Sequence, residues 1–240
     1  MHESKQVAPC GTWVSSLTVE AVTGSTISLS DATADGNVLY WLESRPSENG
    51  RTILNRRLPD GSIEDLTPPP FNVASRVHEY GGGAYTVNGG SIVFSEKSDG
   101  SVWLIEAEKA PRKIVGVSGC RYADFRFVPG TEQIVCVRED HRDRPPTDPE
   151  AAIVLLDMAP RVDPDTNEGE ILVKGPDFLS SPRPSKDGKT LAWLSWNHPD
   201  MPWDSTRLHI AELEFKQVES DYSRGKAVRD DVGDGGSAAF

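Results

Sequence analysis

The stretch "VHEYGGGAY" (77–85) places an imidazole, a carboxylate and a phenol next to three glycines. Such side chains can move protons or hold a charged ligand, and glycine lets the backbone approach another chain closely. In an extended strand, His78 and Tyr80 would share one face, and Glu79 would point to the other. Two interpretations follow: the three side chains line a channel, or His78 and Tyr80 pack and hydrogen-bond between neighbouring structural units.

Patterns for metal and phosphate chemistry are incomplete. The stretch begins like the zinc motif His-Glu-x-x-His, but Gly82 stands where the second histidine belongs, and the glycines disfavour the helix that the motif needs. The acidic loop 163–174 has Glu168 in place of the turn glycine of a calcium loop and Lys174 in place of its closing glutamate. No lysine follows the glycine run as a phosphate loop requires. The sequence therefore predicts no metal and no cofactor.

A serine nucleophile of the α/β-hydrolase type needs the pattern Gly-x-Ser-x-Gly, which holds the serine on a strained turn above an oxyanion hole. The pattern does not occur in the 240 residues, and the nearest matches, at 116–119 and 235–239, fail. We therefore predict no catalytic residues and an inactive chain when it is alone.

The elements that must position these residues are short β-rich runs separated by turn signals. Tight hairpins are predicted at four dipeptides: Asp35-Gly36, Asn88-Gly89, Pro129-Gly130 and Asp187-Gly188. Trp41, Phe94, Cys136 and Trp193 recur at equivalent places, spaced by 42 to 57 residues, which is the size of a propeller blade. The fold class predicted is all-β: a partial β-propeller of about four four-stranded blades in an open arc. A β-sandwich is the alternative, but it does not explain the ordered repetition.

The predicted boundaries are a lead-in segment 1–22 that includes a strand, a partial propeller 23–214, and a charged, disordered tail 215–240. The loops between the second and third strands of each blade should emerge on one face. These polar loops carry His141, His198, Met201 and Trp203, which we predict to form a docking surface.

Charge and composition narrow the partners. The net charge is −12, so nucleic acid and anionic membranes are disfavoured, and the apolar runs are too short to span a bilayer. The first residues lack the apolar core of a secretion signal, and three scattered cysteines indicate reduced thiols. We therefore predict a cytoplasmic protein.

Several stretches together resemble the prolyl oligopeptidase family of serine peptidases, in the branch of dipeptidyl-aminopeptidase and acylaminoacyl-peptidase-like members. They are "GTWVSSLT" (11–18), "LYWLESRPSENGRTIL" (39–54), "RVHEYGGGAY" (76–85), "DFRFVPG" (124–130), "VCVREDHR" (135–142), "GPDFLSSPRPSKDGKTLAWLSWNHPDMPWD" (175–204) and "LHIAEL" (208–213). The chain departs from the family pattern near its start, where Cys10 replaces a tyrosine and Ser16-Leu17 replaces Ser-Pro.

The resemblance implies an N-terminal propeller that, in a complete enzyme, covers a Ser-Asp-His site and restricts access to short peptides. This chain resembles only the propeller portion, so a peptide substrate is expected only in a complete enzyme. Two alternatives stay open: a stand-alone propeller-like module that binds a partner protein, and a non-functional gene fragment. Open blade edges would also favour self-association.

Overall fold

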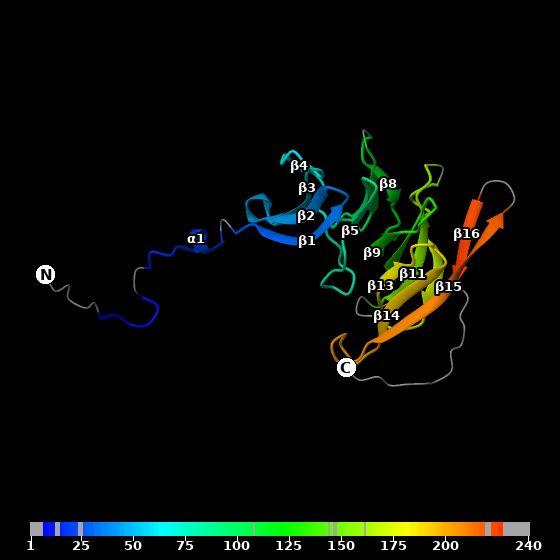
Figure 1. Ribbon diagram of the computed structural model, residues 1–240. Helices are drawn as coiled ribbons and strands as arrows, with labels where there is room; N and C mark the ends of the chain where they lie inside the picture. The colour runs from blue at the N-terminus through cyan, green and yellow to red at the C-terminus, as the bar shows by residue number, and fades with distance from the viewer. Residues whose placement is uncertain are drawn as a thin grey trace.

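The computed structural model describes residues 7–12, 15–23, 26–107, 109–143, 145, 148–160, 162–218 and 222–227. It confirms the all-β prediction: four antiparallel sheets of four strands follow one another along the chain (Figure 1). In the described part, the other regular elements are the short helix α1 (Val19–Thr23) and the 3-10 turn η1 (Pro46–Glu48). No helix in this part is long and apolar enough to cross a membrane.

Each sheet is one blade, with its strands in sequence order. Blade 1 contains β1 (Ser28–Asp35), β2 (Val38–Arg45), β3 (Arg51–Arg57) and β4 (Ile63–Asp65). Blade 2 contains β5 (Tyr85–Asn88), β6 (Ser91–Ser95), β7 (Val102–Ile105) and β8 (Arg112–Val115). Blade 3 contains β9 (Cys120–Phe127), β10 (Gln133–Asp140), β11 (Glu150–Asp157) and β12 (Glu170–Lys174). Blade 4 contains β13 (Phe178–Pro184), β14 (Thr190–Trp196), β15 (Arg207–Val218) and β16 (Tyr222–Ala227).

The four predicted hairpin turns are present. β1 and β2 close with Asp35 opposite Val38, and β5 and β6 close with Asn88 opposite Ser91. Gly36 and Gly89 both have φ near +58°, which a tight turn requires and which glycine adopts without a steric penalty. Because this turn chemistry is local, it can be seen in the sequence.

The apolar cores lie between blades. Blades 1 and 2 share a core that includes Leu42 and Phe94, and blades 2 and 3 share one around Phe125. Blades 3 and 4 share a third core, which includes Leu179 and Trp193. The first strands β5, β9 and β13 lie next to one another along the inner side of the arc. Among the described strands, none of blade 1 pairs with any of blade 4, so the ring is open.

A bulge recurs in the first strand of three blades. The strand register shifts around Asp31, Asp124 and Ser181, whose φ angles are 51°, 59° and 54°. Asp124 links three blades, because one carboxylate oxygen accepts the Gly83 N–H at 2.7 Å and the other accepts the Ser181 N–H at 2.8 Å. The bulge therefore joins blades 2, 3 and 4 at the inner side of the arc.

Two local predictions differ from the structure. The lead-in segment contains helix α1 instead of a strand; a lone strand there would have no partner for its backbone, whereas the Val22 N–H bonds the Thr18 carbonyl within the segment. Residues 77–80 form a turn, and the first strand of blade 2 begins only at Tyr85. Within the predicted tail 215–240, β15 continues to Val218 and β16 follows, while 219–221 and 228–240 lie outside the described residues.

Candidate functional site

The turn at residues 77–80 holds two adjacent side chains in an uncommon backbone conformation. His78 and Glu79 have φ of 56° and 64°, a left-handed region that costs free energy for residues other than glycine. The Gly81 N–H closes the turn on the Val77 carbonyl at 2.8 Å. The buried Glu139 carboxylate, on β10 of blade 3, accepts the His78 N–H at 2.7 Å. A carboxylate from another blade thus stabilises the turn.

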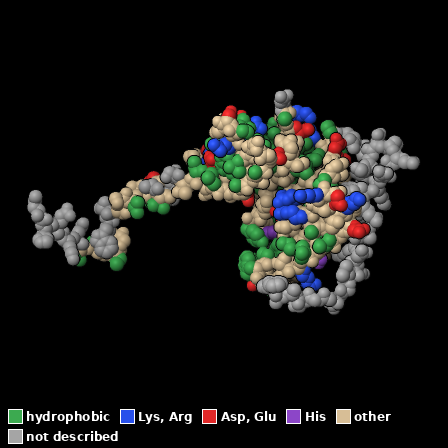
Figure 2. Space-filling model, viewed as in Figure 1, with side chains coloured by type: hydrophobic (Ala, Val, Ile, Leu, Met, Phe, Trp, Pro, Cys, Tyr) green, Lys and Arg blue, Asp and Glu red, His purple; other side chains and the backbone are tan. Residues whose placement is uncertain are grey.

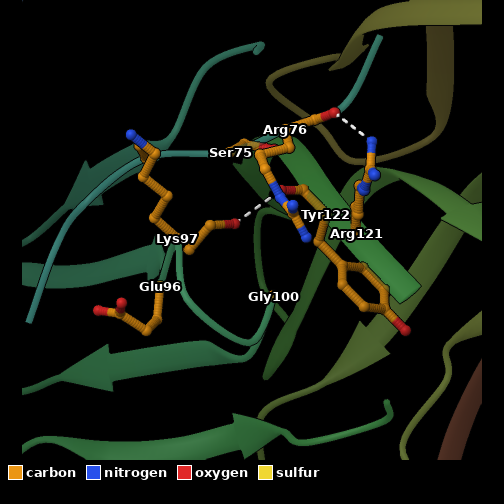
Figure 3. A pocket seen from close by; sticks show the side chains of 9 residues that line it. Ser75, Arg76, Glu96, Lys97, Gly100, Arg121 and Tyr122 are labelled. Atoms are coloured by element: carbon orange, nitrogen blue, oxygen red, sulfur yellow. Dashed lines mark hydrogen bonds between the residues drawn. The ribbon is translucent and has the colours of Figure 1, made fainter. Parts of the chain in front are cut away.

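Charged groups surround the outer side of this turn. Arg121 donates to the Glu79 carboxylate at 2.6 Å. It also donates to the Arg76 carbonyl at 2.9 Å (Figure 3). The hydrogen bond from Arg121 lowers the pKa of Glu79. Glu139 also lies 3.2 Å from Nε2 of His141. Glu79 therefore already has a cationic partner, which argues against its binding a ligand amino group without first exchanging Arg121.

A small cavity lies beside Arg121, between blades 2 and 3 (Figure 3). Its volume is about 10 Å³, and Arg76, Glu96 and Tyr122 contribute to its wall. That volume is close to the lower limit for one water molecule. We assign no ligand to it.

A larger pocket opens on the other side of the turn. It has a volume of about 410 Å³, within the range of small-molecule sites. Its lining combines the turn with blade 4 and includes His78, Tyr80, Gly82, Asp124, Leu194 and Trp196. The pocket lies on the inner side of the arc, because Asp124 belongs to the bulge that links the first strands.

Aromatic rings form one wall of this pocket. The His78 ring lies 5.2 Å from Trp196 and 5.7 Å from Tyr80, measured between centroids. Phe178 stacks on Trp196 at 5.2 Å with an interplanar angle of 9°, and it contacts His198 edge to face at 4.8 Å. These spacings are those of favourable aromatic pairs. The site is thus an aromatic cluster assembled from the turn and blade 4.

His78 is uncharged at neutral pH in this setting. Burial lowers its pKa, and the nearby carboxylates of Glu139 and Asp124 and a hydrogen bond to the Leu179 backbone oppose this effect only in part. The Nε2 atom is buried and has no hydrogen-bond partner among the described residues. A neutral imidazole suits an apolar, ring-lined wall.

The predicted docking residues have different surroundings in the structure. His198 joins the aromatic cluster through Phe178, whereas His141 lies beside Glu139 on the outer side of the turn. Met201 is partly exposed, and Trp203 is 75% exposed on the loop that follows β14. The residues predicted to line a channel and those predicted to form a docking surface therefore come together at His198, through the ring of Phe178.

One serine–histidine pair occurs in blade 4. Oγ of Ser195 lies 2.8 Å from Nε2 of His209, and Trp193 stacks on the imidazole. Ser195 is only 3% exposed, so its hydroxyl cannot meet a substrate. Among the described residues, no group of three or more His, Cys, Asp and Glu side chains could hold a metal ion.

The sequence reasoning missed four residues of this site: Phe178, Trp196, Asp124 and Glu139. Phe178 and Trp196 stand at the facing ends of β13 and β14, where they are paired in the sheet register. The tripeptide Trp196-Asn197-His198, an aromatic residue at the end of a strand followed by a histidine, was the available signal. Nothing local marks Asp124 or Glu139, because their partners come from other blades.

Solved structures show clear similarity to this chain. A puromycin-hydrolysing peptidase of Mycobacterium tuberculosis is 33% identical over 94% of the chain, with a TM-score of 0.75, and the match covers 36% of that enzyme. A puromycin hydrolase is 29% identical, with a TM-score of 0.77, and the match covers 88% of this chain and 34% of that one. An acylaminoacyl peptidase of Pyrococcus horikoshii, 12% identical with a TM-score of 0.53, shares the fold over 89% of this chain and 34% of its own length. Neither the protein-family models nor the curated proteins gave a match.

Proposed function

The chain corresponds to the N-terminal propeller portion of peptidases of the prolyl oligopeptidase family, and from this premise we propose that it controls the access of short peptides to a serine nucleophile. The chain spans about a third of the length of the enzymes that it matches. In this proposal the serine nucleophile lies in a hydrolase domain outside these 240 residues, because they contain no Gly-x-Ser-x-Gly turn.

The observation that carries the proposal is the 33% identity over 94% of the chain to a peptidase that hydrolyses puromycin. The site agrees with it. The pocket of about 410 Å³ lies on the inner side of the arc, beside the first strands, where a channel through a ring of blades would run. His78 and Tyr80 line it, and Glu79 faces Arg121 on the other side of the turn.

A cytoplasmic location is part of the same proposal. Cys10, Cys120 and Cys136 are free thiols in the structure, and the last two are buried. Unpaired cysteines are typical of proteins in a reducing compartment.

The proposal can be tested with a chimera. Residues 11–213 replace the matching portion of the puromycin-hydrolysing peptidase, whose own catalytic portion stays intact. We expect the chimera to cleave dipeptide and tripeptide amides and to cleave peptides of 30 residues or more at least about tenfold more slowly, because a covered site admits only short chains. Equal rates for short and long peptides in a folded chimera would refute a role in access.

The isolated chain serves as the second arm. We expect it to hydrolyse no peptide or aminoacyl chromogenic substrate and to react with no fluorophosphonate probe, since Ser195 is buried and no nucleophile elbow is present. Stoichiometric labelling of any serine would overturn this part of the proposal.

A further inference from the structure

Much of the pocket lining is apolar. The lining includes the His78 and Trp196 rings, the Leu194 side chain and the backbone of Gly81 and Gly82. Trp196 is 5% exposed and is held by its stacking on Phe178, so the wall is rigid before any ligand arrives. A preformed, ring-lined surface loses little conformational entropy on binding.

Two glycines beside the pocket allow a close approach to the bulge of blade 3. A Cβ at Gly82 would come within 3.0 Å of the Ala123 Cβ and 3.3 Å of the Asp124 carboxylate. A Cβ at Gly83 would approach the same carboxylate to 3.0 Å. The segment that follows the turn therefore lies as close to blade 3 as glycine allows, and a side chain at either position would displace the Asp124 carboxylate.

The polar groups around the pocket are few and mostly engaged. Both carboxylate oxygens of Asp124 accept backbone N–H groups. His78 is neutral because burial lowers its pKa. Ser180, Thr206 and Tyr80 are the hydroxyl-bearing residues of the lining. A ligand group that enters this space meets rings, methyl groups and weak dipoles instead of a free charge.

We infer that this pocket binds the aromatic side chain of a peptide or aminoacyl ligand, with the ring edge against His78 and Trp196 and with Tyr80 closing over it. The inference rests on the proposed function, since it names the substrate class for the same channel. Tyr80 is 66% exposed and its ring lies 5.7 Å from that of His78, so it stands at the mouth of the pocket. Edge-to-face contact with such rings favours an aromatic ligand over an aliphatic one of similar size.

The test uses the 240-residue chain and three tripeptides: Phe-Gly-Gly, Leu-Gly-Gly and Gly-Gly-Gly. Binding is measured by isothermal titration and by saturation-transfer NMR. We expect the dissociation constant of Phe-Gly-Gly to be about tenfold lower than that of Leu-Gly-Gly, and Gly-Gly-Gly to bind more weakly still. Equal constants for the Phe and Leu peptides, or no binding of Phe-Gly-Gly, would overturn the inference.

Three variants locate the binding site. Tyr80→Ala removes an exposed ring at the pocket mouth and should weaken Phe-Gly-Gly binding about fivefold. Trp196→Leu should abolish the preference for Phe over Leu; should this buried position fail to fold, Tyr80→Ala still decides the question. Trp203→Ala is the matched control, since Trp203 is 75% exposed and does not line the pocket. Loss of binding in Trp203→Ala with retention in Tyr80→Ala would place the ligand on the loop and refute the pocket.

The binding assay tests the aromatic pocket and the chimera tests the access role, so one proposal can be refuted without the other. An aromatic preference in the isolated chain together with an inactive chimera would refute the proposed access role and keep the pocket. A chimera that selects short peptides but treats Phe and Leu peptides alike would keep the access role and refute the pocket.

Discussion

Asp124 offers the sharpest test of how the blades are joined. Its two carboxylate oxygens accept N–H groups from two other blades, at 2.7 Å from Gly83 and 2.8 Å from Ser181. Asp124→Asn keeps the shape of the side chain but replaces one acceptor oxygen with an NH2 group. This NH2 group cannot accept a hydrogen bond from the backbone N–H that faces it. A hydrogen bond to a charged group contributes about 1.5–3 kcal/mol, so we expect a loss of about 2–3 kcal/mol in the free energy of unfolding. Asp124→Ala removes both bonds and should cost about 4 kcal/mol.

The assay is urea unfolding followed by tryptophan fluorescence. With a slope of about 2–3 kcal/mol/M, Asp124→Asn should lower the midpoint by about 1 M. Asp31→Asn is the matched control: Asp31 occupies the same bulge position with φ of 51°, but its carboxylate is exposed and accepts a hydrogen bond from the adjacent Ser30 hydroxyl. Asparagine tolerates the left-handed region at both positions, so backbone strain cancels in the comparison. Equal midpoint shifts for the two variants would show that Asp124 does not join the blades.

Three further predictions follow from charge and exposure. Arg142 lowers the pKa of Asp140 to about 2, so the pair stabilises the fold above about pH 4, and this stability is lost as the pH falls toward 2. Urea titrations should show that Asp140→Asn lowers the free energy of unfolding by about 1 kcal/mol at pH 7, after allowance for solvent screening, and leaves it unchanged near pH 2. Burial lowers the pKa of His78, so this side chain binds a proton more readily in the unfolded chain, and the stability of the fold should decrease as the pH falls below about 6.5. The His78→Phe variant should lose this part of the pH dependence of the melting temperature, and an unchanged pH profile would contradict the prediction. Leu208 and Ile210 are 67% and 65% exposed on blade 4, so the chain should self-associate as its concentration rises, and the double variant Leu208→Lys/Ile210→Lys should stay monomeric. A native chain that sediments as a monomer at all concentrations would count against this prediction.

Hydrophobic side chains do gather on the surface of blades 1 and 4 (Figure 2). Leu29 and Leu39 are exposed on blade 1, as Leu208 and Ile210 are on blade 4. Within the part of the chain that the structure describes, each of these two blades shares a core with one neighbouring blade, and these side chains lie outside that core.

The blades could be predicted from the sequence because their signals are local. Asn88-Gly89 and Asp187-Gly188 set hairpins through their own backbone preferences, and alternation of apolar residues sets the strands around them. The similarity to the peptidase propellers is also confirmed. What was predictable is therefore the number, order and strand content of the blades.

The site could be predicted only in part. His78 and Tyr80 were singled out by residue type, and they do lie near each other, but in a turn and not on a strand. That turn depends on Glu139, which lies 61 positions later in the chain, and no local preference reports such a contact. The stacked pair of Phe178 and Trp196 reads in the sequence as ordinary apolar strand residues. Whether His78, Glu79 and Tyr80 face a substrate stays a prediction.

The placement of the apolar cores between blades has a consequence for the order in which the molecule opens. A blade in the middle contributes to two cores, as blade 3 does through Phe125 on one face and Val135 on the other. A blade at either end of the described arc shares one core only, as blade 1 does through Leu42. Stability in such an array is a sum of nearest-neighbour contacts. The rate of amide hydrogen exchange should therefore vary along the arc, with the slowest exchange in β10 and β11 and the fastest in β1. Local unfolding would then begin at the end blades.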